Sequence, residues 1–138
     1  GYTDGTFRPN AAITRAEFAA IAARFDKLSG GTKSFSDVPT DHWAYAAITS
    51  AAEKGWVTGY SDGTFRPNNA ITRAEVVKIT NAVLDRTCDK DYVSGNLSKL
   101  TSYNDLTSAY WAYYDILEAS NAHDYKVVND VETWVSLK

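Results

Sequence analysis

A long stretch of this sequence occurs twice. GYTDGTFRPNAAITRAE at Gly1 to Glu17 returns as GYSDGTFRPNNAITRAE at Gly59 to Glu75 with two differences, and we name these the first and second B elements. FSDVPTDHWAYAAI at 35–48 returns in weaker form as YNDLTSAYWAYYDI at 103–116, and these are the first and second A elements. Repeats of this period are units that stack around a shared core. The order is B, A, B, A, followed by a tail from His123 that matches neither element.

Composition narrows the possible partners. With 14 basic and 17 acidic residues the net charge is -3, so no overall positive charge attracts the chain to nucleic acid or to an anionic membrane. No apolar run approaches the ~20 residues of a membrane span, and nothing resembles a signal peptide. Cys88 is the single cysteine, so no disulfide forms within the chain. The sequence begins inside a motif and has no methionine. We expect a piece of a longer, processed protein.

Each B element predicts a turn followed by a helix. The Asp-Gly pairs favour tight turns. Thr14 with Glu17, and Thr72 with Glu75, have the spacing of a capping box that opens a helix. The A elements also show helical spacing of apolar residues, and the polar stretch 85–102 is typical of a surface loop. The expected fold is therefore all-α, with short helices, ordered loops and little or no sheet beyond a turn-sized pairing.

The capping boxes place Arg15 and Arg73 at the first helical position, where the helix dipole disfavours a cation. Two interpretations follow. Each arginine forms an internal salt bridge, for example to Asp4 or Asp62 in the preceding turn, or each contributes to a site for a carboxylate or phosphate. Spacing does not decide between them.

Trp43 and Trp111 lie in equivalent places in the two A elements. Their helical spacing favours packing, although flat rings with a polar tip also suit the faces of sugars. Lys78 replaces the Ala20 of the first copy and distinguishes two otherwise similar sites.

The sequence offers no recognisable catalytic machinery. His42, His123 and Cys88 occur in unrelated contexts. Glu17 and Glu75 could form a paired-carboxylate glycosidase site, but two capping boxes, one per repeat, explain these two glutamates better. The DGTF aspartates lack the alternating oxygen ligands of a calcium loop. We therefore expect no enzyme, no metal and no cofactor.

The joint occurrence of FSDVPTDHWAYAAI and GYSDGTFRPNNAITRAE resembles the S-layer homology family, from Gly1 to about Asn121. The resemblance implies non-covalent anchoring of surface proteins to the bacterial cell wall, and therefore an extracellular location at the wall or S-layer. It also implies three repeats in a three-lobed helical pseudo-trimer that binds secondary cell wall polysaccharide. The usual ligand carries a pyruvate ketal, and the arginine of the TRAE motif contacts its carboxylate.

The resemblance also implies the carbohydrate-binding residues. Thr14-Arg15 and Thr72-Arg73 match the binding motif, and two tryptophans complete two grooves. The first repeat lacks its A element, and the third lacks GYxDGTFRPN and TRAE, so the pseudo-trimer is incomplete. The tail is expected to cap its open end. The remaining residues implied for the binding loop and the grooves are Gly1, Asp4, Gly59, Asp62, Trp43 and Trp111. The tail residues expected to form the cap are Val127, Val128, Val131 and Trp134.

The predicted organisation is the second half of repeat 1 at 1–28, repeat 2 at 35–88, and a degenerate or truncated repeat 3 with a capping tail at 103–138. The leading hypothesis is a non-enzymatic anchor that binds a pyruvylated wall polysaccharide. The alternative is a structural or protein–protein interaction module that packs against an adjoining domain or S-layer subunit. A glycan-cleaving enzyme comes third.

Overall fold

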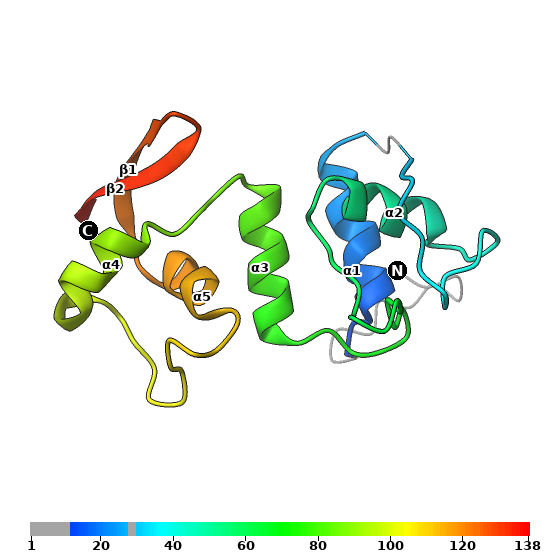
Figure 1. The fold of residues 1–138 in the computed structure, drawn as a ribbon, viewed down its shortest axis with the longest axis horizontal. Coiled ribbons are helices and arrows are strands. Elements are labelled where there is room, and N and C mark those ends of the chain that lie inside the picture. Colours follow the sequence, from blue (N-terminus) through cyan, green and yellow to red (C-terminus); the bar gives the residue numbers. More distant parts are fainter. Residues whose placement is uncertain (1–11, 28–29) are drawn as a thin grey trace. The chain divides into compact units, whose positions relative to one another are not determined.

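The computed structural model describes residues 12–27 and 30–138. They form two compact units, shown in Figure 1. Unit 1 holds the described residues up to Glu53 together with Thr58–Ile71, and unit 2 holds Lys54–Val57 and Thr72–Lys138. The boundary passes through the predicted second repeat at Thr72, and the predicted repeat boundaries remain predictions. Within the described ranges, none of the helices combines the length and apolar character that a membrane crossing requires.

Unit 1 is built on helix α1 (Arg15–Ala22), which continues as the 3-10 helix η1 (Ala23–Phe25), and on helix α2 (Tyr45–Glu53). Helices α1 and α2 pack together. The buried residues of both helices include several alanines, and these small side chains let the two backbones approach closely. The loop 58–71 lies against the start of α1, where Arg15 N–H donates to Asn69 O at 2.9 Å and Ala16 N–H to Pro67 O at 3.0 Å. The buried apolar residues in the described part of unit 1 are Ala16, Ala19, Ala22, Ala23, Val38, Ala44, Ile48, Ala51, Ala52 and Phe65.

Unit 2 contains helices α3 (Arg73–Val83), α4 (Lys90–Asn96) and α5 (Tyr113–Ser120), and the 3-10 helix η2 (Leu97–Lys99). Strands β1 (His123–Val128) and β2 (Val131–Leu137) complete it. Helix α3 packs on α5. A second cluster joins α4, α5 and β2 through buried side chains, namely Val93, Leu100, Leu117 and Trp134.

The all-α prediction is wrong, because β1 and β2 form an antiparallel hairpin and the fold is mixed, although helices dominate. Val128 pairs with Val131, and the two residues between them, Asn129 and Asp130, have positive φ angles of 52° and 60°. These angles belong to a type I′ turn, which asparagine and aspartate tolerate better than other non-glycine residues. The flanking valines and aromatic residues favour strands. The signal for the hairpin is therefore local to the turn and the residues that flank it.

The prediction of a surface loop at 85–102 is also wrong, because α4 and η2 form within this segment. Asp89 is the N-cap of α4, and its carboxylate accepts a hydrogen bond from Tyr92 N–H at 2.9 Å. Val93 supplies the helix with a core contact and is 1% exposed. Two buried apolar residues, Val93 and Leu100, in a largely polar segment are too weak a pattern to predict a helix.

The tail residues expected to form a cap differ in burial, and the capping role remains a prediction. Trp134 is buried, but Val127, Val128 and Val131 are 63%, 45% and 58% exposed. Alternation along β2 places Trp134 on the inner face, and the turn carries the valines into solvent.

Candidate functional site

Both predicted capping boxes are present. Glu17 N–H donates to Thr14 Oγ1 at 3.1 Å, and Thr14 N–H donates to a Glu17 carboxylate oxygen at 2.8 Å. In the second copy Glu75 N–H donates to Thr72 Oγ1 at 3.2 Å, and Thr72 N–H donates to Glu75 Oε2 at 2.8 Å. Helices α1 and α3 therefore begin at their arginines, as predicted.

Arg15 is buried inside unit 1, with 6% of its surface exposed. Its Nε donates to Phe65 O at 2.8 Å, and its NH2 donates to Thr58 O at 3.0 Å. The guanidinium carbon also lies 4.6 Å from the centre of the Phe65 ring and 4.9 Å from that of Tyr60. Arg15 thus holds the loop 58–71 against α1, and several of its donors are used internally.

Arg73 has the same local sequence but a different environment. Its side chain is exposed, and it forms no hydrogen bond, ion pair or ring contact with the part of the chain that the structure describes. Asp62, the salt-bridge partner that the sequence suggested for it, forms an ion pair with Arg66 at 2.9 Å. An unpaired cation at the start of a helix lies where the dipole is positive, so an external anion stabilises it.

Beyond Arg73, α3 and α5 carry a cation next to an exposed aromatic pair. Lys78 Nζ lies 5.5 Å from the centre of the Trp111 ring, and the Tyr110 ring lies 5.7 Å from that of Trp111. Trp111 is 54% exposed. In unit 1, Trp43 is 66% exposed and stacks on His42 at 5.8 Å. The favoured packing interpretation of the two tryptophans is wrong, because both rings face solvent.

The second B loop is fixed by contacts that spacing alone does not show. Asp62 accepts hydrogen bonds from Thr64 N–H and Oγ1 at 3.0 and 2.6 Å. These bonds, together with Arg66, lower the pKa of Asp62 to about 2, so it stays ionised. A Cβ on Gly59 would clash with the Phe35 ring and lie 2.8 Å from Thr64 O, so this glycine allows a close contact. Gly1 and Asp4 lie outside the described residues.

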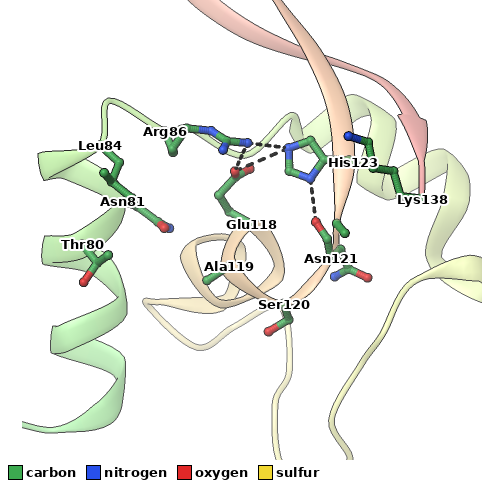
Figure 2. Close-up of a pocket in the computed structure, with 11 residues that line it drawn as sticks. Thr80, Asn81, Leu84, Arg86, Glu118, Ala119, Ser120, Asn121, His123 and Lys138 are labelled. Carbon is green, nitrogen blue, oxygen red and sulfur yellow. Dashed lines mark hydrogen bonds and ion pairs between the residues drawn. The ribbon is translucent and has the colours of Figure 1, made fainter.

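Sequence analysis missed a buried ionic cluster in unit 2, made of Arg86, Glu118, His123 and Glu132 with Trp134. Figure 2 shows three of its members, Arg86, Glu118 and His123. Arg86 NH2 lies 2.8 Å from Glu118 Oε1, and Arg86 Nε donates to Glu132 Oε2 at 2.9 Å. Trp134 Nε1 donates to Glu118 Oε2 at 3.0 Å, and its ring stacks on His123 with centres 3.7 Å apart. The cluster ties α5 and the hairpin to the segment after α3.

The two carboxyls are shifted in opposite directions. Burial raises the pKa of Glu118, and the nearby charge of Glu132 adds to this effect. Burial also acts to raise the pKa of Glu132, but hydrogen bonds from Arg86, Thr87 N–H and His123 outweigh it and lower the pKa. Glu118 is therefore the carboxyl that takes up a proton more readily.

The cluster also contains the donor set of a metal site. Ligand atoms of Glu118, His123 and Glu132 lie within 4.8 Å of one another. Arg86 NH2 occupies the position that faces all three, at 2.8 Å from Glu118 Oε1, 3.0 Å from Glu132 Oε1 and 2.9 Å from His123 Nε2. Metal–ligand bonds to such atoms are shorter, at about 2.0 to 2.2 Å. The arginine already supplies the positive charge, and the set is a structural ion cluster.

Arg86, Glu118 and His123 also line a cavity of about 550 Å³ at the C-terminal ends of α3 and α5 (Figure 2). Asn81 projects from α3, is buried, and donates from Nδ2 to Asp115 O at 2.9 Å. The other walls are Thr80, Leu84, the segment 119–122 and Lys138. No sequence pattern marked this cavity, because its walls come from three separate segments.

The S-layer homology domain model matches residues 1–19 and 34–77. A cellulosome-anchoring protein of Acetivibrio thermocellus is 39% identical over 92% of this chain and 28% of its own length. Cell surface glycoprotein 1 of the same organism is 34% identical over 99% of this chain and 6% of its own length. An S-layer protein of Bacillus thuringiensis subsp. finitimus is 40% identical over 53% of this chain and 9% of its own length. The chain spans only a small part of the length of these relatives. The match to the family model and the similarity to these proteins show that it belongs to the S-layer homology domain family.

Proposed function

We propose that this chain anchors a surface protein to the bacterial cell wall by binding a carboxylate of the wall polysaccharide at Arg73. Membership of the S-layer homology family and the similarity to anchoring and S-layer proteins indicate the anchoring role and the extracellular location at the wall. The finer part of the proposal is the ligand, which we take to be the pyruvate-ketal carboxylate of a secondary cell wall polysaccharide.

The observation that carries the ligand proposal is the exposed guanidinium of Arg73 at the first position of α3. The N–H groups of a helix start and a guanidinium suit a planar carboxylate, which can accept two parallel hydrogen bonds. Lys78 beside the exposed Trp111 ring adds a second cation and a flat apolar surface in the same unit. An acidic polysaccharide offers carboxylates for the cations and sugar rings for the aromatic surface.

The two TRAE arginines are proposed to divide their roles. Arg15 stabilises the loop 58–71 through two backbone carbonyls, so its replacement should destabilise unit 1. Arg73 makes no such contacts with the described residues, so its replacement should reduce binding without unfolding the chain. The exposed Trp43 of unit 1 remains a candidate for contact with a neighbouring sugar of the same polymer.

The module occupies 28%, 6% and 9% of the three relatives described above. A segment that recurs within much longer surface proteins supports an accessory role in attachment. We therefore propose no catalytic role for its residues.

A pull-down on purified cell wall tests the proposal, with the wall used before and after chemical removal of its pyruvate ketals. The variant is Arg73→Gln, and the matched control is Arg24→Gln, which removes the same charge from another exposed arginine. We expect the wild-type chain and the control to bind intact wall and to lose binding when the ketals are removed. Equal retention of Arg73→Gln, or binding indifferent to the ketals, would refute the ligand proposal and favour a protein partner.

A further inference from the structure

Strand β1 forms an open edge of the hairpin in unit 2. Five of its six residues, from Asp124 to Val128, are exposed. The outer edge of β2 is partly occupied, because Trp134 N–H donates to Asp89 Oδ2 at 3.1 Å. Figure 1 shows the hairpin projecting from α4 and α5 of the same unit. An exposed edge strand carries unpaired backbone groups that another strand can join.

Alternate residues of β1 turn their backbone N–H and C=O groups away from β2. Ala122 O, directly before the strand, accepts from Lys138 N–H at 2.9 Å, so the residues at even positions face β2. Tyr125 pairs with Trp134, whose N–H is donated outside the hairpin. Tyr125 and Val127 therefore face outward, and their backbone groups make no hydrogen bond with any other described residue.

The irregularity of the hairpin lies in β2 and leaves β1 regular. Asp124 pairs with Ser136 and Tyr125 pairs with Trp134, so Val135 is the extra residue of a β-bulge. β1 itself runs without interruption along its whole length. Its outer edge can therefore accept a further antiparallel strand.

Two charges of opposite sign flank Tyr125 on β1. Asp124 and Lys126 are both exposed, and they point to the same face because they are two residues apart in a strand. When two copies of β1 pair antiparallel about Tyr125, Asp124 of one copy lies opposite Lys126 of the other, and the reverse.

The same charges disfavour the neighbouring registers. A shift of one hydrogen-bonding step places Lys126 opposite Lys126 or Asp124 opposite Asp124, and like charges directly opposite each other destabilise a sheet. A lysine alone on an edge strand discourages pairing with other strands. With Asp124 two residues before it, the edge becomes complementary to itself in one register.

The residues that face outward also carry exposed apolar surface. Tyr125 and Val127 are 47% and 63% exposed. The guanidinium carbon of Arg86 lies 4.2 Å from the centre of the Tyr125 ring and holds one face of it. Pairing about Tyr125 makes the two tyrosine rings neighbours across the strands, and aromatic pairs of this kind stabilise antiparallel sheets.

We propose that the outer edge of β1 is a self-association site, at which a second copy of this chain pairs antiparallel about Tyr125. The two hairpins then form one continuous antiparallel sheet, which is more stable than an isolated two-stranded one. The contact uses the same surface on both copies, so it closes at a dimer. The residues proposed for polysaccharide binding take no part in it.

The test uses two charge variants of the full chain in sedimentation velocity. Lys126→Glu and Asp124→Lys each place like charges opposite each other when the variant pairs with itself. A mixture of the two variants restores opposite charges at both places. The matched control is Lys99→Glu, which reverses the charge of an exposed lysine in η2 of the same unit.

We expect the wild-type chain and Lys99→Glu to dimerise alike as the concentration rises. Lys126→Glu should weaken the dimer about tenfold or more, because two cross-strand pairs change from attraction to repulsion. Asp124→Lys should also weaken it, and the mixture of the two variants should associate more strongly than either alone. Amide hydrogen exchange at Tyr125 and Val127 should slow as the wild-type chain dimerises.

Four results would overturn the proposal. The first is a wild-type chain that stays monomeric at about 1 mM. The second is Lys126→Glu that dimerises as well as the wild type, and the third is exchange at Tyr125 and Val127 that does not change with concentration. Asp124→Lys also loses an ion pair with Lys138, so its fold is checked by circular dichroism. A folded Asp124→Lys that fails to associate with Lys126→Glu is the fourth.

Discussion

Replacing Arg86 by methionine should destabilise unit 2 strongly. The change leaves two carboxylates, Glu118 and Glu132, whose side chains are each 3% exposed, without their cation. Removing one partner of a buried ion pair costs about 3 to 5 kcal/mol, because the other charge stays buried. The Arg86 side chain is itself 26% exposed, which places the expected loss near the lower limit, at about 3 kcal/mol.

Acid should reduce this loss. Burial, followed by the charge of Glu132, already raises the pKa of Glu118, and a protonated carboxyl no longer needs the cation. In the wild-type chain the pKa of Glu132 is lowered, so its contribution to stability is present above its ordinary value of 4.5 and is lost as the pH falls below that value. The difference between variant and wild type should therefore shrink as the pH falls through this range.

Urea unfolding followed by tryptophan fluorescence measures the effect, since Trp134 stacks directly on His123 in the cluster. Arg24→Met is the control for loss of one exposed arginine. We expect a much lower midpoint for Arg86→Met than for the control at neutral pH, and a smaller difference in acid. Equal midpoints for the two variants, or a difference that grows in acid, would refute the electrostatic explanation.

Three further predictions test the local structure. Thr72→Ala removes the side chain that caps α3 and should lower stability by about 1 kcal/mol; an unchanged denaturation midpoint would remove the capping box from this account. Gly59→Ala forces a methyl group against Phe35 and should cost about 1 to 3 kcal/mol, whereas Gly95→Ala, which meets no neighbour within 4 Å, should be neutral or stabilising on thermal melting. Burial raises the pKa of Cys88 to about 12, so its thiol should react slowly with iodoacetamide at pH 7 and rapidly after unfolding; rapid native labelling would contradict this.

Features set by neighbours in sequence were predictable. Each capping box needs only a threonine and a glutamate three residues apart, and both helices begin where this spacing places them. The signal for the hairpin is equally local, in Asn129-Asp130 between valine-rich runs, although the helical repeats dominate the pattern of the rest of the sequence.

Features set by distant residues were not predictable. Arg15 and Arg73 sit in the same five-residue motif, yet one is buried and the other exposed, because the groups that cover Arg15 come from Thr58 and Phe65. Trp43 and Trp111 have core-like spacing, and only the packed structure places them in solvent. The ionic cluster around Arg86 gathers residues from three segments, so no sequence spacing connects them.

The central claim is that Arg73 binds a sugar carboxylate, and a calorimetric titration tests it most directly. A monovalent pyruvylated sugar and the same sugar without the ketal are titrated into the wild-type chain, Arg73→Gln and Arg24→Gln. We predict that only the pyruvylated sugar binds, and that Arg73→Gln weakens its binding by about 1.5 to 3 kcal/mol while Arg24→Gln leaves it unchanged. Undiminished binding by Arg73→Gln, or equal binding of the sugar without the ketal, would contradict the account.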